Sequence, residues 1–204
     1  MLYNYYYLWK PNMIYPILKY PTQSLLEKSV AIDPDNINHK ELAIHIVRMI
    51  HTMLNTDGVG IASPQVGKNI RVVVLTKDTS NELYVDNKYV TELVEKINNS
   101  TKEEIFSLIS NINYLINPVI TASSKNTTSI TEGCLSVPNT STKLVKRANS
   151  VIVEYIDILG NKKSHIFNNV GSVCIQHEID HLEGKLYFMN LNMIHRNRLM
   201  KGYK

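Results

Sequence analysis

The stretch from His177 to His181 combines residue types that bind a metal ion and transfer protons. It reads His-Glu-Ile-Asp-His. On an α-helix, residues four apart share one face, so the two imidazoles can converge on one ion. Glu178 can reach a water molecule at that ion without being a ligand itself. The spacing therefore predicts a hydrolytic metal centre whose base comes from the same helical turn.

The residues around this motif are typical of a helix over residues 169–183. Apolar residues precede the histidines, Asn168 or Asn169 is a candidate N-cap, and Gly184 is placed to end the helix. A match of this kind also arises by chance, and would then be an amphipathic helix with two partly exposed histidines. The choice between these interpretations depends on the other ligands.

A third protein ligand is needed, because two histidines leave such a metal site incomplete. The chain has only two cysteines, Cys134 and Cys174. Cys134 lies among glycine and small residues, where the backbone can approach a metal closely. Cys174 is three residues before His177 and could face the same side of the helix, but buried free cysteines are usually small apolar wall residues. We therefore favour Cys134 as the ligand, with Cys174 as the alternative.

Three segments occur in an order that resembles the signature motifs of the peptide deformylase family. They are Gly58–Gly67 (GVGIASPQVG), Glu132–Ser136 (EGCLS) and Gln176–Gly184 (QHEIDHLEG). The resemblance covers about residues 14–190, and three ordered motifs are far more specific than one. It implies an enzyme that removes formate from N-formylmethionyl nascent peptides.

The resemblance implies a ligand set of Cys134, His177 and His181. A thiolate with two imidazoles suits Fe²⁺, Zn²⁺, Co²⁺ or Ni²⁺, so the donor atoms alone do not select among these ions. The family resemblance favours Fe²⁺ as the native ion, with one ion per chain. Three protein ligands leave a coordination position open for water or substrate.

The resemblance also implies which groups act on the formyl group. Glu178 would be the general acid and base. The side chain of Gln65 and the backbone N–H of Leu135 would hold the oxyanion that develops on the carbonyl oxygen. One such buried donor is worth roughly 3–4 kcal/mol in comparable sites.

Substrate contacts follow from the same comparison. The Gly60 backbone would pair with the extended substrate peptide, because a glycine lets another backbone come close. Val59, Val173 and Cys174 are candidates for the pocket that takes the methionine side chain, with plain core packing as the alternative.

Other residues match the family pattern or depart from it. Glu132, Arg147 and Asp180 match positions that would link the cysteine loop to the ligand helix, and ordinary surface ion pairs are the alternative. Ser63 stands where the family usually has alanine. Lys143 lies where the family often supplies an arginine near the substrate, and a lysine offers a point charge rather than a two-pronged donor.

Length and composition predict one domain with a full core. The chain has 204 residues, 44% of them hydrophobic, with a net charge of +4. We expect residues 1–13 to be an N-terminal extension and 14–204 to be one catalytic domain with an insertion at about 78–113. The insertion could be a lid over the cleft, an enlarged family insertion, or surface decoration.

The expected partners and location follow from charge and composition. Basic residues gather after His195, and this C-terminus could contact the ribosome transiently or simply be a solvated tail. No stretch reaches the roughly 18 apolar residues of a membrane span. We expect no membrane and no specific nucleic acid as partners, a monomer, and a bacterial cytoplasmic location, with an organelle as the alternative.

Hydrophobic periodicity predicts the elements that must position these residues. Helices are expected over 39–53, 89–97 and about 100–109, the last opened by a capping box at Ser100 and Glu103. Strands are expected over 70–75 and 115–120, and a hairpin over 150–158 and 162–167. These elements predict an α+β fold. The resemblance adds antiparallel and mixed sheets around a central helix that carries the His-Glu-x-x-His motif.

Two other functions use the same helix. A metallopeptidase would carry His-Glu-x-x-His, but peptidases of this type generally use His or Glu as the third ligand. A binding module stabilised by metal would need neither Glu178 nor Gln65. Deformylation is the favoured function because it requires ligand, base and oxyanion groups together.

Overall fold

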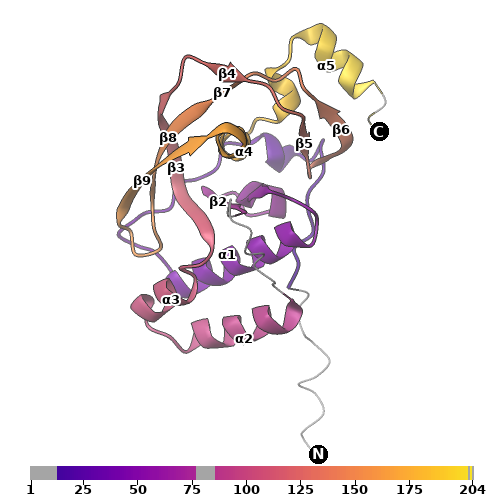
Figure 1. Cartoon of the computed structure of the whole chain (residues 1–204). Helices are drawn as coiled ribbons and strands as arrows, with labels where there is room; N and C mark the ends of the chain where they lie inside the picture. The colour runs from indigo at the N-terminus through magenta and orange to yellow at the C-terminus, as the bar shows by residue number, and fades with distance from the viewer. Residues whose placement is uncertain (1–12, 77–85, 202, 204) are drawn as a thin grey trace, which may run out of the picture.

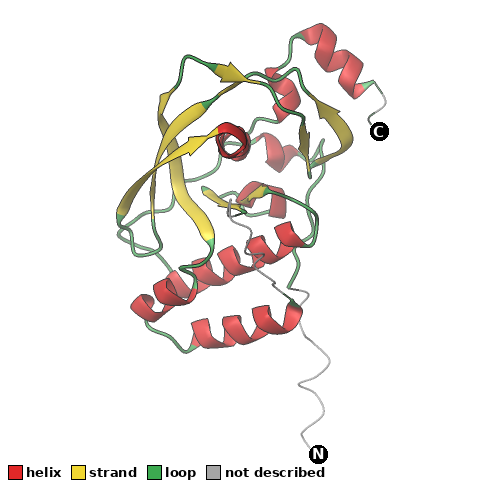
Figure 2. Cartoon of the chain, in the orientation of Figure 1, coloured by secondary structure: helices red, strands yellow, loops and turns green. Residues whose placement is uncertain are grey.

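The computed structural model describes residues 13–76, 86–201 and 203. Its centre is the helix α4 (Asn169–Leu182), which Figure 1 shows nearly end-on. The strands of the largest sheet lie beside and below it, and a smaller strand pair lies on its other side (Figure 2). This is the α+β arrangement around a central motif-bearing helix that the sequence predicts.

The largest sheet has five antiparallel strands in the order β1-β2-β3-β8-β9. Their bounds are Gly60–Ala62, Val72–Leu75, Asn113–Ser123, Ser150–Ile156 and Lys162–Asn168. Two short ribbons complete the strands, β4 (Thr127–Thr128) with β7 (Arg147–Ala148), and β5 (Glu132–Cys134) with β6 (Val137–Thr142). Parallel pairing within the described residues is confined to one isolated bridge between Val30 and Ile70. The expected mixed character of the sheets is therefore limited to that bridge.

The described residues form five α-helices. Besides α4 they are α1 (His39–Leu54), α2 (Asn87–Asn98), α3 (Lys102–Leu108) and α5 (Met193–Met200), with short 3-10 helices η1 (Gln23–Leu26), η2 (Ser63–Val66) and η3 (Tyr187–Asn190). Asn38 caps α1 by accepting a hydrogen bond from the backbone of Glu41. No helix in the described part of the chain is both long enough and apolar enough to cross a lipid bilayer.

Strand β2 shows how one sheet serves two cores. Successive strand side chains point to opposite faces, so Val72 and Val74 pack towards α1 while Val73 and Leu75 pack towards α4. A third cluster, around Tyr187 and Phe188, packs beneath β6 and the C-terminal segment. The metal-motif helix is thus held between the second and third clusters.

The segment expected as an insertion is part of the main core. Helices α2 and α3 pack against α1, and the apolar side chains that they and the turn after them contribute are buried. These residues are Val90, Leu93, Ile97, Ile105 and Ile109. Residues 87–109 are therefore not surface decoration, because their apolar side chains are buried in the core that α1 shares.

The element boundaries differ from the predictions in informative ways. The capping box that opens α3 joins Thr101 and Glu104, one residue later than predicted. The hairpin β8–β9 is confirmed, with Gly160 at φ +83° in its turn. Residues 1–12, which hold nearly all of the expected N-terminal extension, lie outside the described residues, whereas Met13 packs against the main core.

Candidate metal centre

Helix α4 carries the two predicted histidine ligands and the predicted base on its inner side. His177, Glu178 and His181 are all buried. The helix begins after Asn168, whose side chain makes no capping bond, and is followed by Gly184 at φ +68°. Its contacts with β1, β2 and β9 fix it against the sheet, so the histidines are presented from a rigid element.

Cys134 at the end of β5 meets the two histidines. Its Sγ lies 3.2 Å from His181 Nε2. One ligand atom from each of Cys134, His177 and His181 lies within 4.8 Å of the other two. The structure thus brings together the three residues favoured as ligands, and Cys174 is outside this group.

The chemistry of these donors fits a divalent ion. Burial favours a protonated Cys134 thiol, but His181 and His177 outweigh burial and lower its pKa well below the usual value. Burial likewise lowers the pKa of His177, yet hydrogen bonds with Cys134 and Glu132 raise it to about 10. The Cys134 thiolate and the Glu132 carboxylate thus favour a positive charge at the site. A divalent cation supplies that charge while the thiolate and both imidazoles remain deprotonated.

A buried ion-pair network orients the ligands. Nδ1 of His177 donates to Glu132 Oε2 at 3.0 Å, so Nε2 is the nitrogen that faces Cys134. Arg147 donates to both oxygens of Glu132, at 3.0 and 2.9 Å, and to Asp180 Oδ2 at 2.5 Å. The three residues expected to link the cysteine loop to the ligand helix do so, and Arg147 and Glu132 are buried rather than on the surface.

Gln65 reaches the site from the turn η2. Its Oε1 accepts the backbone N–H of Ala62 at 2.8 Å, so its amide NH₂ points the other way. That NH₂ lies 3.2 Å from Ser136 Oγ and 3.8 Å from Cys134 Sγ. The orientation of the carboxamide is thereby fixed with its donor hydrogens towards the metal ligands.

A cavity of about 420 Å³ opens beside these groups. Its walls include the predicted site residues Val59, Gly60, Gln65, Cys134, Leu135, Val173, Cys174, His177 and Glu178. Glycine at position 60 lets Glu178 and Cys174 approach the backbone closely, because a Cβ on it would lie 2.6 Å from Glu178 Oε1 and 2.9 Å from Cys174 Sγ. Lys143 is exposed and is not among the lining residues.

Comparisons with known proteins agree with this geometry. A protein-family model described as polypeptide deformylase matches residues 14–197. The chain belongs to the polypeptide deformylase family.

Individual deformylases are similar over most of their length. The peptide deformylase of Baumannia cicadellinicola is 33% identical over 189 residues, which are 93% of each chain, and that of Karelsulcia muelleri is 32% identical over 88% of this chain and 79% of that protein. A class I type b deformylase from Acinetobacter baumannii, solved with Met-Ala-Ser bound, has a TM-score of 0.68 at 27% identity and covers 87% of this chain and 98% of its own. The chain is therefore a peptide deformylase, a metal-dependent hydrolase that removes the N-formyl group from nascent peptides. The metallopeptidase alternative is not favoured.

Sequence reasoning missed two residues that shape this deformylase site. Ser136 is fully buried and accepts a hydrogen bond from the Gln65 amide, although the EGCLS motif points only to Glu132, Cys134 and Leu135 as site residues. Tyr187 stacks on His177 with ring centres 6.0 Å apart and donates to Thr140 at 2.7 Å. Ser136 was open to discovery from its motif, whereas no local pattern marks Tyr187.

Proposed function

We propose that this deformylase divides its reaction among metal binding, proton transfer and oxyanion stabilisation. The metal ligands are Cys134, His177 and His181. Glu178 transfers the proton. Gln65 and the backbone N–H of Leu135 stabilise the oxyanion. When bound, the ion supplies Lewis acidity to a water molecule and to the formyl carbonyl. The convergence of three ligand atoms within 4.8 Å of one another is the observation that carries the proposal.

Glu178 is suited to proton transfer by its surroundings. It is buried, and its Oε2 has no hydrogen-bond partner among the described residues. Burial is the largest influence on its pKa, which lies above the ordinary value despite the nearby histidines. A carboxyl group shifted in this direction can take a proton from the attacking water and return it to the leaving amine.

Gln65 and Leu135 flank the place where the carbonyl oxygen becomes negative. The Gln65 amide is held by Ala62 on one side and by Ser136 on the other, so it is oriented before the substrate arrives. Leu135 follows the ligand Cys134 directly, and its carbonyl accepts a bond of 2.5 Å from Lys19. Donors fixed in advance stabilise the oxyanion without reorganisation.

The cavity fits an extended formylmethionyl peptide. A relative was solved with the peptide Met-Ala-Ser bound, and we extend this substrate class to the present chain. The substrate backbone runs along Gly60, and Val59, Val173 and Cys174 form the apolar wall for the methionine side chain. Val59 is 60% exposed in the structure, so a bound peptide would cover it.

The native ion that we propose is Fe²⁺, with Zn²⁺, Ni²⁺ and Co²⁺ as substitutes. All four accept one thiolate and two imidazoles, and the affinity order favours Zn²⁺ over Fe²⁺, so zinc can replace iron during isolation. The hydrogen bond from His177 to Glu132 supports any of these ions, because it fixes the imidazole tautomer.

The proposal extends to the wider molecule. Residues 14–204 form one catalytic domain with an insertion at 78–113, and residues 1–13 are an extension. The start of the matched range at residue 14 supports the boundary between the extension and the domain. The protein is monomeric and works in a bacterial cytoplasm. Helix α5 exposes Met193 and Ile194 beside basic side chains, and this surface suits transient contact with the ribosome.

The test measures formate release from a formyl-Met tripeptide, and metal content, on one sample purified without oxygen. We expect rapid release with about one ion per chain. Cys134→Ala is expected to lose the ion and the activity together. Cys174→Ala is the matched control, because it removes the other thiol and should keep the ion. An intact ion in Cys134→Ala would overturn the proposed ligand set.

A further inference from the structure

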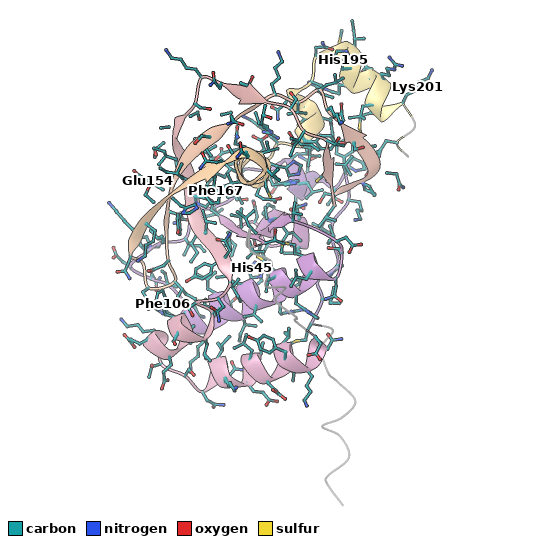
Figure 3. The ribbon with its side chains drawn as sticks, in the orientation of Figure 1. His45, Phe106, Glu154, Phe167, His195 and Lys201 are labelled. Carbon is teal, nitrogen blue, oxygen red and sulfur yellow. The ribbon has the colours of Figure 1, made fainter. Side chains whose placement is uncertain are left out.

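A hydrogen-bonded trio, buried at two of its three residues, lies behind the Gln65 turn, and the reaction proposed above does not use it. His45 on α1, labelled in Figure 3, has its Nε2 2.8 Å from Ser63 Oγ. Its Nδ1 lies 3.0 Å from the hydroxyl of Tyr15. His45 is 1% exposed and Ser63 is fully buried. Apolar side chains could occupy the same interior positions, so the presence of three hydrogen-bonded polar side chains suggests a specific role.

The direction of each hydrogen bond in the trio can be assigned. The Ser63 hydroxyl has one hydrogen, and the carbonyl oxygen of Lys68, 2.8 Å away, can only accept it. Ser63 must then accept from His45, so the neutral imidazole carries its hydrogen on Nε2. Its Nδ1 is left to accept from Tyr15. Burial, with Lys68 and Arg48 nearby, lowers the pKa of His45 to about 3, in accord with a neutral ring.

Ser63 closes the turn that carries Gln65. Its backbone carbonyl accepts from Lys68 N at 3.2 Å while its hydroxyl donates to the Lys68 carbonyl. The backbone carbonyl and the hydroxyl of Ser63 are therefore both bonded to the same residue on the far side of the turn. Gln65 lies between these two residues, and its own carbonyl accepts from Leu18 at 2.8 Å.

The trio is anchored at its outer end as well. The backbone N–H of Tyr15 donates to Thr52 Oγ1 at 2.9 Å, and the guanidinium of Arg48 lies 3.9 Å from the centre of the Tyr15 ring. Both Thr52 and Arg48 belong to α1. A continuous path of fixed groups therefore leads from helix α1 to Ser63, the residue next to the Ala62 N–H that holds the Gln65 carboxamide.

We propose that Ser63, held by His45 and Tyr15, is a positioning residue that sets the direction of the Gln65 amide N–H towards the reacting carbonyl. The proposal rests on the proposed role of Gln65. Without the Ser63 hydroxyl the turn loses its side-chain tie and His45 keeps a buried N–H with no acceptor. The turn then relaxes, and the Gln65 donor no longer matches the position of the oxyanion.

The test is a double-mutant cycle on metal-loaded enzyme with wild type, Ser63→Ala, Gln65→Ala and the double variant. Formate release from a formyl-Met tripeptide gives kcat and KM, and metal content is read on each sample. We expect Ser63→Ala to lower kcat about tenfold with KM and metal content unchanged. In the Gln65→Ala background the same change is expected to have no further effect, because its target is gone.

Two further variants separate positioning from folding. Ser29→Ala is the matched control, because Ser29 is a buried serine whose hydroxyl has no partner among the described residues, and its kcat should equal that of wild type. Tyr15→Phe removes only the outermost hydroxyl and should lower kcat about two- to threefold.

Each other outcome has a distinct meaning. Equal losses of kcat from Ser63→Ala in both backgrounds, or no loss in either, would overturn the positioning role while leaving Gln65 in place. An unchanged kcat in Gln65→Ala would instead overturn the proposed role of Gln65, and the positioning role with it.

Discussion

At the residue scale, the site depends on the absence of a side chain at Gly60. Gly60 faces Glu178 so closely that an alanine Cβ would lie 2.6 Å from its Oε1. Gly60→Ala is therefore expected to displace the carboxylate and lower kcat at least about tenfold, with the metal retained. Steady-state kinetics and metal analysis on the same sample test this.

Gly171→Ala is the control for that substitution. The Cβ that it adds would meet Phe167 at 3.8 Å, an ordinary contact, and the residue lies within α4. Because alanine is favoured over glycine in helices, this variant should be at least as stable as wild type and equally active. Equal kcat values in the two variants would contradict the proposed closeness of Gly60 to the catalytic carboxylate.

The substitution Glu178→Gln distinguishes proton transfer by Glu178 from metal binding. Glu178→Gln keeps the shape of the side chain but removes its capacity to take a proton. We expect a loss of about 10²- to 10⁴-fold in kcat with full metal content. Glu154→Gln, on the outer part of β8, is the matched control and should behave as wild type. Turnover that survives in Glu178→Gln would assign the base elsewhere.

The lowered pKa of His45 should make the free energy of unfolding depend on pH. Its folded pKa of about 3 lies below the ordinary value of 6.5, because burial and then Lys68 and Arg48 disfavour the charged ring. Between these values the unfolded chain binds more protons, so the free energy of unfolding falls on acidification from pH 6.5. His45→Gln should make this slope shallower by up to about 1.4 kcal/mol per pH unit. Denaturant titrations of both proteins at several pH values test it, and parallel slopes would contradict it.

At the scale of elements, Arg147 joins the ligand helix to the cysteine loop. It bonds Glu132 of β5 and Asp180 of α4, and its side chain is 7% exposed. Arg147→Met would leave a buried carboxylate without its partner, which costs about 3–5 kcal/mol of unfolding free energy. The ligands would also lose their orientation, and metal affinity should fall about 10- to 100-fold.

A surface pair provides the comparison for Arg147. Lys102 and Glu103 lie 3.9 Å apart, with side chains 59% and 68% exposed. Lys102→Met should change the free energy of unfolding by less than about 1 kcal/mol, because exposed pairs contribute little. Metal titration and urea unfolding of both variants would distinguish them, and similar small effects would mean that Arg147 does not organise the site.

The sequence predicts those helices and strands whose periodicity, caps or turns lie within their own residues. It does not predict features that depend on partners far away in the chain. The helices α1 and α4 and the hairpin β8–β9 follow from periodicity, caps and a glycine turn within their own residues. Strand β2 was predicted two residues too long, because Ile70 pairs with Val30, forty residues earlier. Likewise the EGCLS motif located Cys134, but the contact between Ser136 and Gln65 depends on chain folding over 71 residues.

At the scale of the whole molecule, helices that stabilise the fold lie apart from the residues that line the active-site cavity. Helices α2 and α3 complete the main core, and Figure 1 shows them at the side of α1 away from α4. Ile97→Ala, at a fully buried position of α2, should lower the free energy of unfolding by about 2–5 kcal/mol. The kcat per metal-loaded chain should stay unchanged, since none of the residues lining the cavity comes from these helices. A matching loss of kcat would instead make α2 part of the active site.

The C-terminal segment returns to the beginning of the chain. The hydroxyl of Tyr203 donates to the carbonyl of Tyr20, 183 residues away, and the Tyr20 N–H donates to the carbonyl of Ser136. Synthesis delivers the N-terminal parts first, so Gln65 and Cys134 leave the ribosome long before His177 and His181 can join them. A fragment that stops short of α4 cannot hold the ion. This deformylase, which acts on chains that are still being synthesised, therefore becomes active only after its own helix α4 has been synthesised.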